Sequence, residues 1–149
     1  MVLSGMSTEE QVNENIRIAS YAVSASLTED ELKVFDEVKS IMNEKIKVPC
    51  TACGYCMPCP HGVNIPGCFS SYNDKFLLED KLYWWKYAQT LGAFSAEPAF
   101  ASKCVECGKC ELHCPQNIEI RKELKAVAKE MEGILFRPLA AAARKMLRL

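Results

Sequence analysis

Eight of the nine cysteine residues of this chain fall into two dense runs, a proline follows each run, and Cys68 lies apart. The first run has the form C-x2-C-x2-C-x2-C and comprises Cys50, Cys53, Cys56 and Cys59. The second has the form C-x2-C-x2-C-x3-C and comprises Cys104, Cys107, Cys110 and Cys114. A cubane cluster has four irons, and each iron needs one thiolate. Three cysteines on a tight loop reach three corners, so a remote cysteine supplies the fourth. The runs therefore predict two [4Fe–4S] clusters.

The second run has the spacing of bacterial two-cluster proteins, in which the fourth cysteine ligates the other cluster. Applied to both runs, this crossed pattern gives two ligand sets. They are Cys50, Cys53, Cys56 and Cys114 for one cluster, and Cys104, Cys107, Cys110 and Cys59 for the other. The first run is one residue short before Cys59, and Cys68 is the obvious substitute. We favour Cys59, because a proline follows it as one follows Cys114.

Other uses of these cysteines are weaker interpretations. Paired cysteines also form tetrahedral zinc sites, but two consecutive four-cysteine runs crowd too many thiolates for two separated pairs. A disulfide scaffold is weaker still. Cys68 is better explained as a small apolar residue on a helix than as a ligand.

The composition is that of an ordinary globular domain. The chain has 149 residues, of which 49% are apolar and 25% charged, with a net charge of −1. This balance gives no reason to expect nucleic acid or a membrane surface as a partner. We expect no signal peptide and no transmembrane helix, and hence a reducing cytoplasm, where cysteines favour metal ligation over disulfides.

Helices must position the two runs. A capping box of Ser7 and Glu10 predicts a helix through Val12, Ile16 and Ala19, and a second box, Thr28 and Glu31, opens a helix to about Ile46. The apolar face of that second helix comprises Leu32, Phe35, Val38, Ile41 and Met42.

Three further helices are predicted after the first run. Asn64 is a cap candidate before a helix that begins at Pro66. Another helix runs through Leu82, Trp85 and Leu91 and stops near Gly92, and the third covers Ile120–Met131. Strand evidence is limited to Val2–Leu3 and Asn117–Ile120, so the predicted fold is all-α.

A weak internal repeat relates the two halves. Each run ends in Cys-Pro, then an extended segment with an isoleucine (63–65 and 118–120), then a helix. Such a repeat is expected if each half holds one cluster.

Two stretches resemble the C-terminal ferredoxin-like extension of certain bacterial and archaeal aldo/keto reductases. They read VPCTACGYCMPCPHGVNIP and KCVECGKCELHCPQNIEIRKEL. The N-terminal VLSGMSTEEQVNENI is similar to the last strand, loop and helix of the reductase barrel. The resemblance implies that Glu14 and Asn15 correspond to residues that contact the adenine of NAD(P)H in a complete barrel. Gly5 and Gln11 replace the usual lysine and arginine of NADPH-binding members.

The resemblance further implies that residues 1–26 are a barrel remnant and residues 27–132 a two-cluster helical ferredoxin-like domain. Residues 133–149 carry Arg137, Arg144, Lys145 and Arg148 with no acidic residue, which predicts a basic amphipathic helix. We favour packing of this helix on its own chain over docking on an acidic partner or on anionic lipid. No residue corresponds to the family's catalytic tetrad, so we do not expect the chain to be catalytic alone. The spacing of the runs also resembles the helical ferredoxin domains of fumarate reductase and dihydropyrimidine dehydrogenase.

These observations predict a one-electron relay. Its partner would be a redox protein, a flavoprotein or the missing reductase barrel. A structural or redox-sensing iron–sulfur module is the alternative.

Overall fold

The computed structural model describes residues 5–79 and 81–146. Its elements are α1 (Glu9–Tyr21), α2 (Glu29–Lys45), α3 (Ile65–Leu77), α4 (Tyr83–Thr90), the short 3-10 helices η1 (Ala101–Lys103) and η2 (Glu111–His113), α5 (Ile120–Met131) and α6 (Phe136–Met146). All elements of this described part are helical, and no strand occurs in it, which confirms the predicted all-α fold.

The chain divides into two compact units, Met1–Ser40 and Ile41–Leu149. All nine cysteines belong to the second unit. None of the helices in the described residues is long and apolar enough to cross a membrane.

The N-terminus of α1 differs from the prediction by one residue. The cap is Thr8, whose Oγ1 accepts a hydrogen bond from the Gln11 backbone N–H at 3.3 Å. The Gln11 side chain in turn accepts from the Ser7 N–H at 2.9 Å. The predicted Ser7–Glu10 box is therefore wrong, because Gln11 rather than Glu10 closes the first turn.

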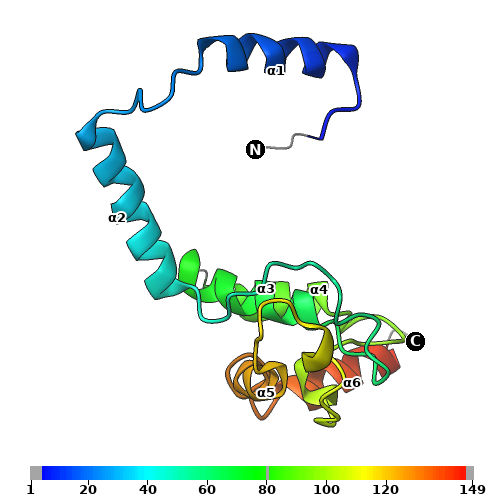
Figure 1. Ribbon diagram of the computed structural model, residues 1–149. Helices are drawn as coiled ribbons and strands as arrows, with labels where there is room; N and C mark the ends of the chain where they lie inside the picture. The colour runs from blue at the N-terminus through cyan, green and yellow to red at the C-terminus, as the bar shows by residue number, and fades with distance from the viewer. Residues whose placement is uncertain (1–4, 80, 147–149) are drawn as a thin grey trace. The chain divides into compact units, whose positions relative to one another are not determined.

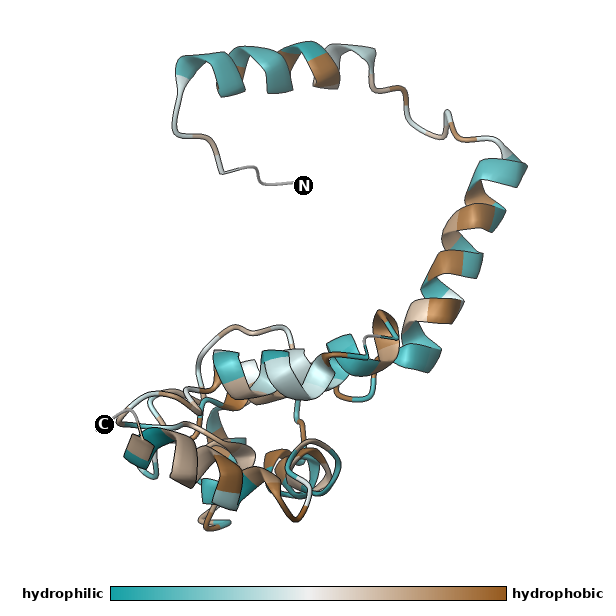
Figure 2. Cartoon of the chain, turned by 180° about the vertical axis from the view of Figure 1, so that it is seen from behind, coloured by the Kyte–Doolittle hydropathy of each residue, from teal (hydrophilic) through white to brown (hydrophobic). Residues whose placement is uncertain are grey.

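The cap of α2 is as predicted. Glu31 accepts a hydrogen bond from the Thr28 N–H at 2.8 Å, and Thr28 Oγ1 accepts from the Glu31 N–H at 3.3 Å. Figure 2 shows hydrophobic and hydrophilic residues alternating along this helix. Its apolar face is exposed, with Phe35 at 61%.

The second unit contains the core. Here α3 packs against α4 and α5, and α5 packs against η1 (Figure 1). Asn64 caps α3, since its Oδ1 accepts from the Gly67 N–H at 3.0 Å, and Pro66 is the second residue of the helix. Large fully buried side chains from α3 and α5, among them Phe69, Leu124 and Val127, fill the space between these helices.

The second strand prediction, Asn117–Ile120, is wrong, because this segment has no paired strand in the described residues and its last residue opens α5. The internal repeat that suggested this strand appears in the structure as two equivalent helix starts. α3 begins at Ile65 and α5 at Ile120, each six residues after the last cysteine of a run. Both isoleucines are buried. The other expected strand, Val2–Leu3, lies outside the described residues.

The C-terminal helix packs on its own unit. The ring of Phe136 lies 5.7 Å from that of Tyr87 and 5.1 Å from that of Phe100. Ala140 is buried, while Leu139 stays exposed. α6 ends at Met146, and the predicted basic residue Arg148 lies outside the described residues.

Candidate metal centres

The two cysteine loops share one backbone path at their starts. Two residues after the first cysteine, Ala52 and Glu106 have φ of 54° and 60°. Their N–H groups donate to Cys50 Sγ and Cys104 Sγ, both at 3.4 Å. Hydrogen bonds to ligand sulfur are among the features that set a cluster's potential. Each loop thus supplies a backbone N–H group that donates to the sulfur of its first cysteine.

The same path continues at two glycines. Gly54 and Gly108 have φ of 80° and 75°, and their carbonyl oxygens accept from the N–H groups of Met57 and Glu111. Positive φ of this kind is open to glycine at little cost. The loops therefore turn at equivalent points.

The loops differ only before their last cysteines. The first run has the shorter connection and a cis Met57–Pro58 bond, whereas the second run forms η2. Beyond this point they agree again. The Cys59 carbonyl accepts from the Gly62 N–H at 3.0 Å, and the Cys114 carbonyl accepts from the Asn117 N–H at 3.1 Å. Cys59 and Cys114 thus begin equivalent backbone turns despite the missing residue.

The first cavity, here called the Cys114 cavity, is bordered by four cysteines. They are Cys50, Cys53, Cys56 and Cys114. Phe69 and Ile120 add apolar walls. Its volume is about 20 Å³.

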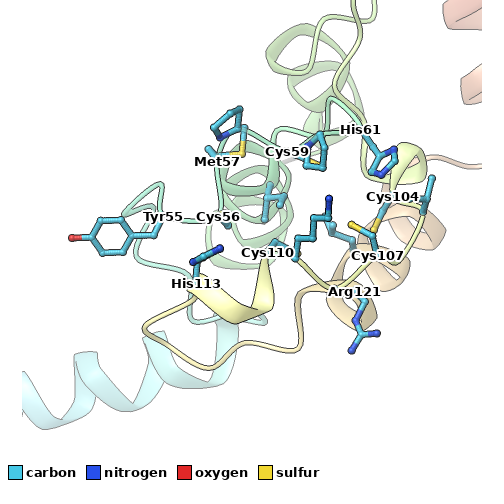
Figure 3. Close-up of a pocket in the computed structure, with 17 residues that line it drawn as sticks. Tyr55, Cys56, Met57, Cys59, His61, Cys104, Cys107, Cys110, His113 and Arg121 are labelled. Carbon is cyan, nitrogen blue, oxygen red and sulfur yellow. The ribbon is translucent and has the colours of Figure 1, made fainter.

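The second cavity, here called the Cys59 cavity, is wider, with a volume of about 390 Å³. Its thiols come from both loops and are those of Cys56, Cys59, Cys104, Cys107 and Cys110. Figure 3 shows labelled residues of both runs around this one space. Cys56 borders both cavities. The second cysteine of each run, Cys53 or Cys107, is exposed, whereas the other six cysteines of the two runs are half-buried.

Burial and neighbouring thiols act on the cysteine protons. Burial raises the pKa of Cys56, and the nearby thiols of Cys50, Cys114 and Cys53 raise it further. Burial also raises the pKa of Cys110 to about 11, and the charge of Glu111 contributes to the rise. A cysteine binds a metal as a thiolate, so metal binding has to displace the protons of these thiols.

Cys68 lies apart from both cavities. It is fully buried in α3, and its thiol points toward the Ala99 carbonyl at 3.8 Å. Burial raises its pKa strongly, which keeps the thiol protonated. His61 and His113 are exposed and border the Cys59 cavity.

Side chains that the sequence patterns did not single out hold both loops. Asn73 of α3 accepts from the N–H groups of Lys47 and Val48, each at 3.0 Å, and donates to the Val48 carbonyl at 2.7 Å. These bonds fix the backbone just before Cys50. In the sequence, the only sign of this role was that Asn73 is a polar residue between the apolar positions of α3.

Glu111 joins η2 to the start of α5. Its carboxylate accepts from the Arg121 backbone N–H and from Nε of the same residue, both at 2.9 Å. Hydrogen bonds from Arg121 hold the pKa of Glu111 below its usual value. These bonds join Glu111, which precedes Cys114, to Arg121, which follows it, and so hold together the two ends of the segment that contains Cys114.

The nucleotide-contact residues implied by the family resemblance lie on α1. Glu14 forms an exposed ion pair with Arg17 at 3.5 Å, and Asn15 is half-buried. Both belong to the first unit, which contains no cysteine.

The donor sets fit iron–sulfur clusters in kind and number, because each cavity is bordered by at least four thiols and thiolates hold such clusters. Within the described residues, no three histidine, cysteine, aspartate or glutamate side chains are arranged to hold a single metal ion.

Residues 49–119, which include both cysteine runs, match the family model of the 4Fe-4S dicluster domain. The chain matches no curated protein and no solved structure. The family match supports an iron–sulfur domain of the ferredoxin-like kind at residues 49–119, with [4Fe–4S] binding and electron transfer.

Proposed function

We propose that this chain relays single electrons through two [4Fe–4S] clusters, one in each cavity. The observation that carries the proposal is the crossed lining. The first three cysteines of each run border a cavity together with the last cysteine of the other run. A bound cluster supplies one-electron redox chemistry at a potential set by charge, hydrogen bonds to sulfur and burial.

The chain's own residues hold and tune these sites. The N–H groups of Ala52 and Glu106 donate to Sγ of the first cysteine in each loop. Phe69 and Ile120 line one site, and Leu124 lines the other, which limits the access of water. Crossed ligation would also keep the two clusters close together.

A redox protein or flavoprotein would exchange electrons at the exposed ends of the loops. Cys53 and Cys107 are exposed, and Tyr55, Val105 and Leu112 are exposed apolar side chains in the same loops, at 68%, 59% and 83%. Exposed apolar side chains beside a redox centre are a suitable surface for a transient partner.

The wider context in this proposal is an aldo/keto reductase-type oxidoreductase. The chain would be its electron-transfer part, and Glu14 and Asn15 would contact NAD(P)H only together with a complete barrel. What supports this context is the resemblance of residues 2–16 and of the two cysteine stretches to that family.

Anaerobic purification followed by iron and sulfide analysis tests the proposal. About eight irons per chain and two interacting signals in electron paramagnetic resonance of the reduced protein are expected. Stoichiometric zinc in a colourless protein would exclude the proposal. A protein that holds iron but unfolds on reduction would point to the structural or redox-sensing alternative.

A further inference from the structure

A buried phenol–carboxylate pair lies in the core beside the second cysteine run. The hydroxyl of Tyr87 in α4 donates to Oε1 of Glu132, just after α5, at 2.7 Å. Tyr87 is fully buried and Glu132 is only 8% exposed. Burial raises the pKa of Tyr87, so its hydroxyl keeps the proton that it donates.

Both members of the pair hold the backbone that leads to Cys104. The Ala101 N–H donates to the Tyr87 hydroxyl oxygen at 3.1 Å, and the Ser102 N–H donates to Glu132 Oε1 at 3.0 Å. These two residues open η1, which ends immediately before Cys104. Side chains from two different elements thus fix the approach to the first ligand of the run.

The first run is held in a comparable way by a neutral group. Asn73 makes three hydrogen bonds to the backbone just before Cys50. An amide is therefore sufficient to position such a segment. Glu132 differs, because its Oε2 is buried and has no hydrogen-bond partner among the residues that the structure describes, which costs stability. A carboxylate at this place supplies a charge that positioning alone does not require.

This charge lies near the ligands of the Cys59 cavity. Ser102, whose N–H donates to Glu132 Oε1 at 3.0 Å, lies two residues before Cys104, and Cys104 borders that cavity. Charges interact more strongly in the protein interior than in water, because less solvent screens them. The Glu132 carboxylate should therefore act on a group bound in that cavity.

We propose that Glu132, held by Tyr87, positions the Cys104 segment and that its carboxylate lowers the reduction potential of the cluster bound in the Cys59 cavity. This inference rests on the proposed function. A nearby negative charge opposes the addition of an electron, so net charge is one of the features that set cluster potentials.

Glu132→Gln separates the two roles, because an amide oxygen can accept the same two hydrogen bonds without the charge. We expect the purified variant to keep about eight irons. In a redox titration followed by electron paramagnetic resonance, one cluster should shift to a more positive potential. In the Cys59→Ser background, where only the Cys114 cavity keeps its ligands, Glu132→Gln should produce no shift.

Glu130→Gln is the matched control, since Glu130 is exposed and paired with Lys75. It should leave both potentials unchanged. Tyr87→Phe removes the hydroxyl that bridges Ala101 and Glu132, and it should lower the iron content toward four per chain, while the control stays near eight.

Several outcomes would overturn the inference. Unchanged potentials in Glu132→Gln would exclude the role of the charge. Loss of a cluster from that variant would contradict the hydrogen-bond argument, and full loading with unchanged potentials in Tyr87→Phe would exclude positioning. A wild-type protein without iron would instead contradict the proposed function itself.

Discussion

Cys59 and Cys68 are the two cysteines whose roles the spacing leaves open. Cys59 borders a cavity with Cys104, Cys107 and Cys110, whereas Cys68 borders neither cavity and is buried in the core. Cys59→Ser should therefore lose one cluster and about half of the iron, and Cys68→Ser should keep both clusters. Iron analysis of the two anaerobically purified variants checks this. Equal iron content in both variants would contradict the assignment of Cys59.

Glu111 should make stability depend on pH. Arg121 holds the pKa of Glu111 below its unfolded value of about 4.3. The pair therefore stabilises the fold above that value, and its contribution is lost as the pH falls through the lowered pKa. Glu111→Gln should lower the unfolding temperature at pH 7, and the difference from wild type should shrink below about pH 4.

The measurement is the midpoint of thermal unfolding by circular dichroism, for variant and wild type at each pH. Glu119→Gln is the control, because its ion pair with Lys122 is largely exposed. A difference that persists unchanged to pH 3 would show that Glu111 stabilises the fold through packing rather than charge.

At the residue scale, the sequence predicted the groups whose spacing encodes their role. The eight cysteines follow a local rule, so their runs could be recognised without a structure. Asn73 and Glu132 follow no such rule. Their partners lie 25 and 30 residues away, at Val48 and Ser102, and only the packing of helices brings them together.

At the scale of elements, the two loops depend on backbone conformations that most residues avoid. Gly54 has φ of 80°, and no atom within 4 Å would contact an added Cβ. Gly54→Val therefore makes no clash at Cβ, and the positive φ alone is expected to cost about 1–2 kcal/mol. We expect a lower iron content, because this turn sets the direction of the chain between Cys53 and Cys56.

Ala52→Gly is the matched substitution in the same loop. Ala52 has φ of 54°, which glycine adopts more readily, so this variant should load at least as much iron as wild type. Iron per chain, measured after identical reconstitution, compares the two. A Gly54→Val protein with full iron content would mean that the loop tolerates another path.

Helices were predictable where a start signal and an apolar period agree. α5 has the predicted bounds Ile120–Met131, and Thr28 and Glu31 form the predicted box before α2. The start of α1 was misplaced, because Ser7 and Thr8 both offer a hydroxyl and only the side-chain geometry of Gln11 decides between them. The strand prediction at 117–120 failed because burial of Ile118 and Ile120 next to a helix start mimics strand alternation.

At the scale of the whole molecule, the two units differ in charge and in burial. Residues 1–40 contain eight acidic and three basic side chains, whereas the remainder of the chain has a net positive charge. The buried apolar side chains of the described residues all follow position 47, as do all nine cysteines. The sequence could predict the amphipathic faces of α1 and α2, but a partner for an apolar face is not encoded in its periodicity.

Removal of residues 1–27 tests whether the second unit is sufficient for cluster binding. This deletion retains Thr28, so α2 keeps its cap. None of the described residues among 5–27 is buried, so their loss should remove little of the hydrophobic stabilisation. We expect about eight irons per chain and an unfolding temperature within a few degrees of the full chain. Iron analysis and thermal unfolding by circular dichroism measure both. If the shortened chain loses iron or aggregates, the iron–sulfur domain depends on the N-terminal residues, and the second unit is not sufficient for cluster binding.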